Sequence, residues 1–141
     1  MKTNYDVIVI GGGPGGSSIA TLLQRKGWDV VLFEKAKFPR YHIGESLVPG
    51  CVPILQELGV FKEMDEREMQ RKYGITFVWG EDSTPWHVRW DETPSEITKN
   101  YTFQVNRSDF DSLLLKNAKR NGVEVHESTP VVSFIKEGVW C

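Results

Sequence analysis

The sequence predicts an α/β fold with a parallel sheet that begins with a Rossmann-like βαβ unit. Three observations lead to this prediction. A short apolar run ends in a block of glycines, an amphipathic helical segment follows the glycines, and a second apolar run ends in an acidic residue. Apolar runs on either side of a helical segment are typical of parallel strands that are joined by a crossover helix.

The elements of this unit follow in order from their patterns. Residues 5–10 are almost all apolar, as in a parallel strand that is buried on both faces. A helix is expected over residues 14–26, because its last turn holds a lysine and a glycine follows, the residue types that helix C-termini prefer. The second strand is expected over residues 29–33, with Glu34 directly after it. Residues 4–35 therefore form the predicted βαβ unit.

After this unit the pattern changes twice. Residues 36–72 are expected to form a loop and short helices, broken at Gly59. Apolar residues then alternate with a period of two, which predicts an inserted antiparallel β segment over residues 73–105. A helix and two returning strands are expected over residues 107–136, and the last of these strands covers residues 131–135.

Composition and charge narrow the classes of function. The chain has 141 residues, enough for one domain over residues 1–141, and its 17 basic and 19 acidic residues leave no basic excess for binding nucleic acid. No apolar run approaches the roughly 20 residues that cross a membrane. Two cysteines and three scattered histidines indicate neither a disulfide framework nor a metal site. We therefore expect a reduced, cytoplasmic protein.

The glycine block has the spacing of a dinucleotide-binding loop, G-x-G-x-x-G, between a predicted strand and a predicted helix. Gly11 permits a tight turn, Gly13 lets the backbone approach a pyrophosphate, and Gly16 brings the helix close to the strand. Free N–H groups and the helix dipole then favour an anion. The cofactor-binding residues expected in this loop are Gly11, Gly13, Pro14, Gly15, Gly16 and Ser17. The alternative is a glycine loop that only caps a helix.

Glu34 predicts an adenosine site at the end of the second strand. A carboxylate at this place can accept hydrogen bonds from both ribose hydroxyls, and it would repel a 2′-phosphate, which disfavours NADP. The alternative is a surface glutamate without a ligand. Together with the glycine loop, Glu34 predicts an adenine dinucleotide but does not separate FAD from NAD.

Three further segments resemble the flavin-dependent halogenases, a branch of the FAD monooxygenase superfamily. The segment FPRYHIGESLVP (residues 38–49) does so together with the GGGPGG loop and the pair Glu34-Lys35. The segments KYGITFVWG (residues 72–80) and FQVNR (residues 103–107) resemble the halogenase branch in particular. The resemblance covers almost the whole chain, and it implies FAD as the cofactor.

In such enzymes reduced FAD and O2 convert a halide into hypohalous acid, which a lysine guides to an electron-rich aromatic substrate. The resemblance implies that Lys72 is this lysine, and the alternative is a lysine on a solvated, charged helix face. It also implies FAD contacts for Lys35, Arg40, Ile43, Gly44, Glu45, Ser46, Gln104 and Arg107. For Arg40 and Arg107 the alternative is an exposed or helix-capping arginine.

The resemblance further implies three kinds of partner: a separate flavin reductase that supplies reduced FAD, a halide, and an aromatic substrate that is free or bound to a carrier. Two motifs that the family places further along, Gly-Asp and G-W-x-W-x-I-P, do not occur. We therefore expect a family fold that is incomplete, a chain that is inactive alone, and a role for a complementing C-terminal polypeptide. Two other functions stay open: an FAD monooxygenase or geranylgeranyl-reductase-like enzyme, and a non-catalytic FAD-binding fragment.

Overall fold

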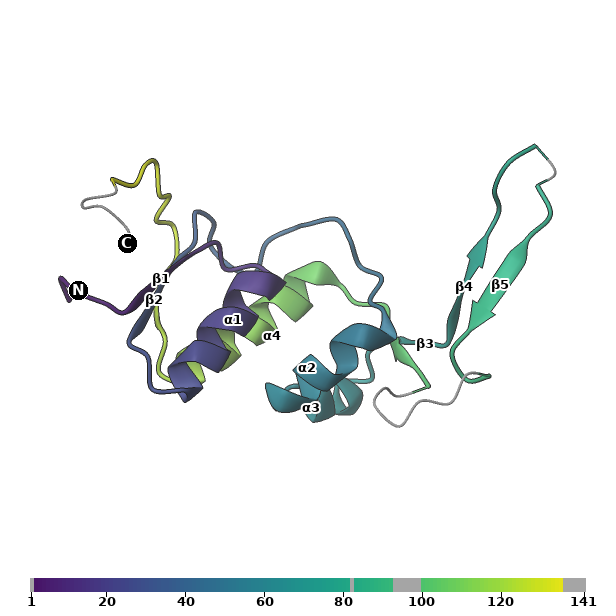
Figure 1. Cartoon of the computed structure of the whole chain (residues 1–141), viewed down its shortest axis with the longest axis horizontal. Coiled ribbons are helices and arrows are strands. Elements are labelled where there is room, and N and C mark those ends of the chain that lie inside the picture. The colour runs from purple at the N-terminus through teal and green to yellow at the C-terminus, as the bar shows by residue number, and fades with distance from the viewer. Residues whose placement is uncertain (1, 82, 93–99, 136–141) are drawn as a thin grey trace, which may run out of the picture. The chain divides into compact units, whose positions relative to one another are not determined.

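A computed structural model of the protein describes residues 2–81, 83–92 and 100–135 (Figure 1). The contacts within the chain divide it into two compact units. The first unit comprises residues 1–41 and 108–141, and the second comprises residues 42–107.

A three-stranded parallel sheet and two helices form the first unit (Figure 1). Strand β1 (Val7–Ile10) pairs with β2 (Val30–Phe33), and β2 pairs with β7 (Glu124–His126), so the strand order is β1-β2-β7. Helix α1 (Pro14–Arg25) connects β1 with β2, and helix α4 (Arg107–Arg120) precedes β7. The predicted α/β fold with its βαβ unit and parallel sheet is confirmed.

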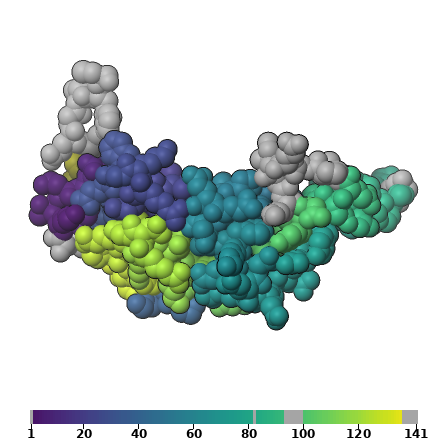
Figure 2. Space-filling view, turned by 90° about the horizontal axis from the view of Figure 1, so that it is seen from below, coloured from purple at the N-terminus to yellow at the C-terminus, as the bar shows by residue number. Residues whose placement is uncertain are grey.

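The core of the first unit lies between the sheet and both helices. It contains buried residues of β1, β2, α1 and α4 and one residue just before β7, namely Val9, Val30, Leu32, Ala20, Leu115, Ala118 and Val123. The purple and blue surface of the first residues lies directly against the yellow-green surface of α4 (Figure 2). Ala20 of α1 and Ala118 of α4 are both completely buried in this core. Their small side chains let the two helices lie close to the same face of the sheet.

Two expectations about the strands of this unit are wrong. Strand β1 is not buried on both faces, because the core covers the face with Val9 while Ile8 and Ile10 remain 60% and 59% exposed. Residues 131–135 do not form a strand. A strand needs a neighbour that accepts its hydrogen bonds, and none of the described segments pairs with these residues.

Glu127, just after β7, connects the loop that follows β2 to helix α4. Its carboxylate accepts hydrogen bonds from the Phe38 backbone N–H at 2.8 Å and from Lys119 Nζ at 2.7 Å, and Lys37 Nζ lies 3.6 Å away. Burial alone would raise the pKa of Glu127. The two hydrogen bonds and the two lysine charges outweigh burial, so that the pKa lies below its ordinary value of 4.5.

We expect Glu127→Gln to lower the free energy of unfolding at neutral pH by about 1–3 kcal/mol, because hydrogen bonds to a charged acceptor are lost. Since the pKa is lowered in the folded state, this contribution is complete above the ordinary pKa. It disappears as the pH falls through the folded-state pKa. Urea unfolding at neutral pH and near pH 3 measures the difference, with the exposed Glu66 changed to Gln as a control. An equal loss at both pH values would contradict this account.

The second unit consists of short helices and two small antiparallel sheets. A 3-10 turn (Pro49–Cys51) leads into α2 (Val52–Glu57), and α3 (Phe61–Glu66) follows. Strand β3 (Arg71–Lys72) pairs with β6 (Thr102–Phe103), and β4 (Gly74–Phe77) pairs with β5 (Trp86–Arg89). The predicted antiparallel insertion is therefore present.

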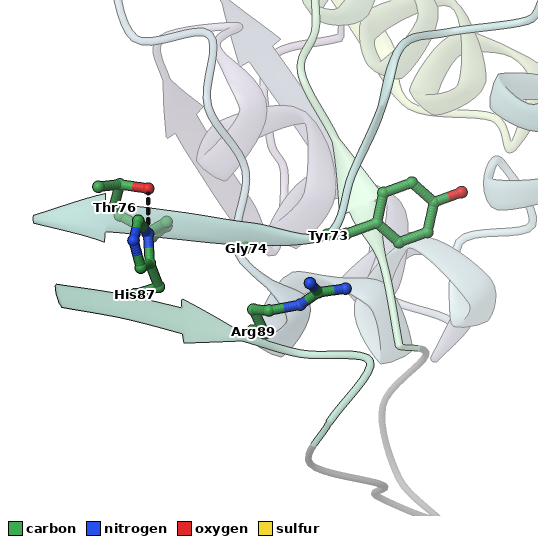
Figure 3. Close-up of a pocket in the computed structure, with 6 residues that line it drawn as sticks. Tyr73, Gly74, Thr76, His87 and Arg89 are labelled. Atoms are coloured by element: carbon green, nitrogen blue, oxygen red, sulfur yellow. Dashed lines mark hydrogen bonds between the residues drawn. The ribbon is translucent and has the colours of Figure 1, made fainter. Parts of the chain in front are cut away.

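The β4–β5 hairpin has two chemically different faces. Its register gathers four apolar residues on one face: Ile75, Phe77, Trp86 and Val88. On the other face Thr76 Oγ1 and His87 Nδ1 lie 2.8 Å apart, and these two residues and Arg89 contribute to the lining of an open pocket of about 380 Å³ (Figure 3). Two-stranded hairpins are marginally stable in water, and the stack of Phe77 on Trp86, with ring centroids 4.4 Å apart, adds a cross-strand aromatic contact to this one.

Candidate functional site

The predicted phosphate loop connects β1 to the first turn of α1. Gly11 has a φ of +101°, in the left-handed region that glycine favours. Gly13 precedes the helix with an extended backbone, and α1 starts at Pro14, which needs no N–H partner there. A Cβ on Gly16 would lie 1.9 Å from the carbonyl oxygen of Gly11, so strand and helix approach as closely as the glycine spacing predicts.

Ser17 holds the loop from inside. Its backbone N–H donates to Gly13 O at 2.9 Å, and its hydroxyl donates to Gly12 O at 2.8 Å. The residue is completely buried. Its hydroxyl therefore fixes the shape of the loop, while the first-turn N–H groups of α1 have no partner within the helix and can bind an anion.

Glu34 is buried beside the same loop. Its Oε2 accepts the Gly12 N–H at 2.6 Å, and its Oε1 accepts the Ala36 N–H at 2.8 Å. A carboxylate oxygen can accept two hydrogen bonds, so each oxygen keeps a lone pair for a ribose hydroxyl. An adjacent cavity of about 240 Å³ is lined by Ile10, Gly11, Phe33, Glu34, Lys35, Pro130 and Val131.

Pro130 and Val131 were not predicted as part of this cavity. They reach it because β7 runs parallel to β2, so the chain leaves both strands at the same edge of the sheet. The apolar pattern of residues 131–135 indicated only a strand. The feature that could have revealed the cavity is that residues after two neighbouring parallel strands meet at one edge.

The guanidinium group of Arg40 is largely buried beside the glycine loop. Its Nη2 lies 3.5 Å from Asp111 Oδ2, its guanidinium lies over the Phe38 ring at 4.7 Å, and its Nη1 has no hydrogen-bond partner among the described residues. Nη2 is also 3.6 Å from the position that a Cβ on Gly13 would occupy. A buried N–H without an acceptor is unfavourable, and an anion bound at Gly13 would supply one. Arg40 is thus neither an exposed nor a helix-capping arginine.

The sequence did not reveal Asp111 as the partner of Arg40. Asp111 is completely buried on α4, next to Phe110 and two positions before Leu113. An acidic residue beside the apolar stripe of a helix is a signal for a buried ion pair, because an unpaired carboxylate is costly there. Which basic residue Asp111 would meet could not be inferred from the spacing along the chain.

The second unit gathers the other predicted residues around one extended segment. Ser46 forms a β-bridge with Gln104, Leu47 N–H donates to Phe103 O at 3.1 Å, and Val105 N–H donates to Glu45 O at 2.8 Å. Residues 45–47 thus pair with the edge of β6 that faces away from β3. These backbone bonds fix the place of each side chain in the segment.

Arg107 holds the loop that leads into this segment. Its Nη1 donates to Ile43 O at 2.9 Å and to Gly44 O at 3.2 Å. Gly44 has a φ of +97°, and a Cβ there would lie 3.3 Å from Arg107 Nη1. Arg107 therefore acts on the loop backbone, and Ile43, which is 75% exposed, contributes its carbonyl to this contact.

Lys72 lies in β3 and not on a helix, because α3 already ends at Glu66. The alternative of a solvated helix face is therefore wrong. Lys72 Nζ donates to Ser46 Oγ and, at 3.4 Å, to Leu47 O, and it lies 5.0 Å from the centroid of the Trp90 ring. The side chain is half-buried, and burial lowers the pKa of its ammonium group.

The predicted residues thus form two groups, each within one unit. The group of the first unit consists of Gly11, Gly13, Pro14, Gly15, Gly16, Ser17, Glu34, Lys35 and Arg40. The group of the second unit consists of Ile43, Gly44, Glu45, Ser46, Lys72, Gln104 and Arg107. Within the described ranges no helix is long and apolar enough to cross a membrane, and no three metal-ligating side chains cluster.

The first group defines an adenine-dinucleotide-binding α/β protein: a glycine loop at a helix N-terminus, a buried acid after the second strand, and a buried arginine nitrogen that finds no acceptor in the described part of the chain. A family model for an FAD binding domain matches residues 4–139. The chain belongs to this family of FAD-binding domains.

Several proteins to which the chain is similar are named as halogenases. The chain is 45% identical over 131 residues to a tryptophan 2-halogenase of Chondromyces crocatus, covering 93% of this chain and 24% of that protein. It is 33% identical to a 1H-pyrrole-2-carbonyl-[peptidyl-carrier protein] chlorinase of Pseudomonas fluorescens, covering 96% and 34%. The structure of the myxobacterial chondrochloren halogenase matches with a TM-score of 0.86 and 41% identity, covering 95% and 31%. The chain therefore spans about a quarter to a third of these relatives, in their N-terminal part.

Proposed function

We propose that this chain is the FAD-binding part of a flavin-dependent halogenase that acts on an electron-rich aromatic compound, with Lys72 as its catalytic lysine. The observation that carries this proposal is the position of Lys72. In a chain similar to halogenases over nearly its whole length, a half-buried lysine points its ammonium group at neutral oxygens and an indole ring, not at a carboxylate. Such an ammonium group keeps its capacity to bind an oxidant.

The first unit would hold the adenosine and pyrophosphate parts of FAD. Glu34 would accept the ribose hydroxyls beside Lys35, and Arg40 Nη1 would donate to the pyrophosphate. The loop residues Gly11, Gly13, Pro14, Gly15, Gly16 and Ser17 would shape the phosphate site at the start of α1. In the second unit, Ile43, Gly44, Glu45, Ser46, Gln104 and Arg107 would form and hold the loop that meets the flavin ring and ribityl chain.

When bound and reduced, FAD would give two electrons to O2 and the halide would give the other two, so that one oxygen atom ends in water and the other in hypohalous acid. The Lys72 ammonium donates a hydrogen bond to the oxygen of this acid and thereby makes the halogen more electrophilic. Lys72 thus favours attack by an aromatic carbon: the carbon–halogen bond forms as the oxygen–halogen bond breaks, and the ring proton leaves with the oxygen as water.

We assign the supply of reduced FAD to a separate flavin reductase, as the resemblance to the flavin-dependent halogenases implies. The relatives that act on tryptophan and on a carrier-bound pyrrole support an aromatic substrate that is free or bound to a carrier protein. The composition supports a cytoplasmic location. A C-terminal polypeptide, in the same chain or in trans, would complete the halide and substrate sites.

This function can be tested in a polypeptide that joins the chain to the remaining part of a halogenase. We expect halogenated product that requires halide, and a loss of at least about 100-fold in product formation for Lys72→Ala, within the range of lost acid–base groups. Oxidation of reduced flavin should continue. The matched control is Lys62→Ala, since Lys62 is 87% exposed.

Other outcomes separate the competing functions. Oxygenated product without any need for halide would indicate an FAD monooxygenase. Binding of FAD without turnover, even in the joined polypeptide, would indicate a non-catalytic fragment. Halogenation that persists in Lys72→Ala would contradict the role of Lys72 while leaving the halogenase function intact.

A further inference from the structure

We propose that Ser46 is a positioning residue for Lys72: its hydroxyl fixes the direction of the N–H with which Lys72 binds a ligand. The catalytic meaning of this inference rests on the proposed halogenase function. The placement of Ser46 next to Lys72 rests on the structure itself. The resemblance implied a contact between Ser46 and FAD, whereas the observed partner of the Ser46 hydroxyl is Lys72 Nζ.

The backbone fixes Ser46 and Lys72 relative to each other. Lys72 pairs with Thr102 on one edge of β6, and Ser46 bridges to Gln104 on the other edge. Both residues are thus attached to the same short strand, and the side chain of Lys72 reaches across it to the Ser46 hydroxyl. Leu47, one residue further along, offers its carbonyl to the same nitrogen at 3.4 Å.

The hydrogen bonds leave one N–H of Lys72 available. An ammonium group has three N–H donors. Ser46 Oγ accepts one, Leu47 O accepts the second, and Trp90 presents its ring face to the cation at 5.0 Å. No other acceptor for Lys72 occurs among the described residues, so the third N–H is left for a ligand. Without Ser46 the group could rotate and the third N–H would lose its direction.

A hydroxyl suits this role better than a carboxylate does. A carboxylate would stabilise the ammonium form strongly and occupy its donors. A serine hydroxyl accepts a hydrogen bond from the ammonium and can donate one to the neutral amine, so the contact survives a proton transfer. Burial, which lowers the pKa of Lys72, makes such a change of state easier.

The inference can be tested by the reactivity of Lys72 toward an acetylating reagent, measured by peptide mass spectrometry on the complete 141-residue chain. The ammonium form makes a stronger hydrogen bond to the Ser46 hydroxyl than the neutral amine does, so Ser46→Ala should move the pH profile of Lys72 acetylation down by about half to one pH unit. At a fixed pH below the midpoint of the Lys72 profile, Lys72 should therefore be acetylated roughly 3- to 10-fold faster in Ser46→Ala than in the natural chain. Ser46→Thr, which keeps a hydroxyl, should restore the original profile.

Three controls separate positioning from a general loosening of the fold. Ser133→Ala removes the hydroxyl of an exposed serine and should change nothing. The exposed Lys62 and Lys119, each paired with a glutamate, serve as internal references, and neither profile should shift. Circular dichroism confirms that each variant is folded. If Ser46→Ala does not fold, Ser46→Cys keeps the size of the side chain and weakens the acceptor, so the same shift is expected from it.

An unchanged Lys72 profile in folded Ser46→Ala or Ser46→Cys would overturn the inference, and so would an equal shift in Ser46→Thr. The assay needs no FAD, halide or turnover. A shifted profile together with a joined polypeptide that does not halogenate would therefore disprove the proposed function and leave the positioning role in place.

Discussion

Gly16→Ala should destabilise the first unit by about 3 kcal/mol or more, which is at the upper end of the cost of overpacking. The new Cβ would lie 1.9 Å from Gly11 O and 3.3 Å from Val9 Cγ1. The closer atom belongs to the backbone, directly after β1, and Gly11 N–H donates to Phe33 O at 2.8 Å. Relief of the overlap would therefore have to shift α1 or break the connection between β1 and β2.

Gly15→Ala is the matched control for this prediction. A Cβ on Gly15 would meet nothing within 4 Å, and the residue is exposed in the same turn of α1. Alanine favours a helix over glycine by about 1 kcal/mol, so this variant should be as stable as the natural chain or slightly more stable. Urea unfolding followed by circular dichroism measures both. Equal stability of the two variants would show that the helix can move away from β1 at little cost.

Gly13→Asp should lower the affinity for FAD by at least about 100-fold, which abolishes binding at ordinary concentrations. The fold should remain stable. The Cβ position of Gly13 is 3.6 Å from Arg40 Nη2, which is an ordinary contact. The backbone of Gly13 is extended, so any residue can adopt its conformation. An aspartate there would place a negative charge where the pyrophosphate should bind, and it could itself accept from the buried Arg40 Nη1.

A titration of the purified chain with FAD, followed by flavin fluorescence and desalting, measures this effect. The natural chain should bind FAD in a saturable manner. Thr3→Asp adds the same charge at an exposed residue and should leave the affinity unchanged. Undiminished binding by folded Gly13→Asp would mean that the pyrophosphate does not lie at this loop. Absence of binding by the natural, folded chain would mean that its two units together do not retain the cofactor without a further polypeptide.

The sequence was most informative where the structure is local. The βαβ unit could be predicted because the turn at Gly11, the start of α1 at Pro14 and the acid at Glu34 each depend on residues close in the chain. The pattern could not show that the core covers only one face of β1, because that depends on α4, about 100 residues later. The exposure of Ile8 is the result.

Contacts between distant residues account for what the sequence could not show at the site. Arg40 meets Asp111, and Lys72 meets Ser46 and Trp90. The residue types indicated what kind of partner each group requires. An arginine that is buried needs a hydrogen-bond acceptor, and a lysine ammonium group needs oxygen atoms that accept its N–H donors. The choice of partner is set by strand pairing and helix packing, which spacing along the chain does not record.

The two backbone contacts of Glu34 limit how this fold can be re-engineered for other nucleotides. A common way to make such a site accept a phosphorylated ribose is to replace the acid after the second strand by a small or basic residue. In this chain the same carboxylate also accepts the N–H groups of Gly12 and Ala36. A single exchange would leave two donors without their acceptor, one of them buried with Gly12 in the glycine loop. A change of cofactor specificity would therefore require a second substitution that restores an acceptor, and the two would have to be introduced together.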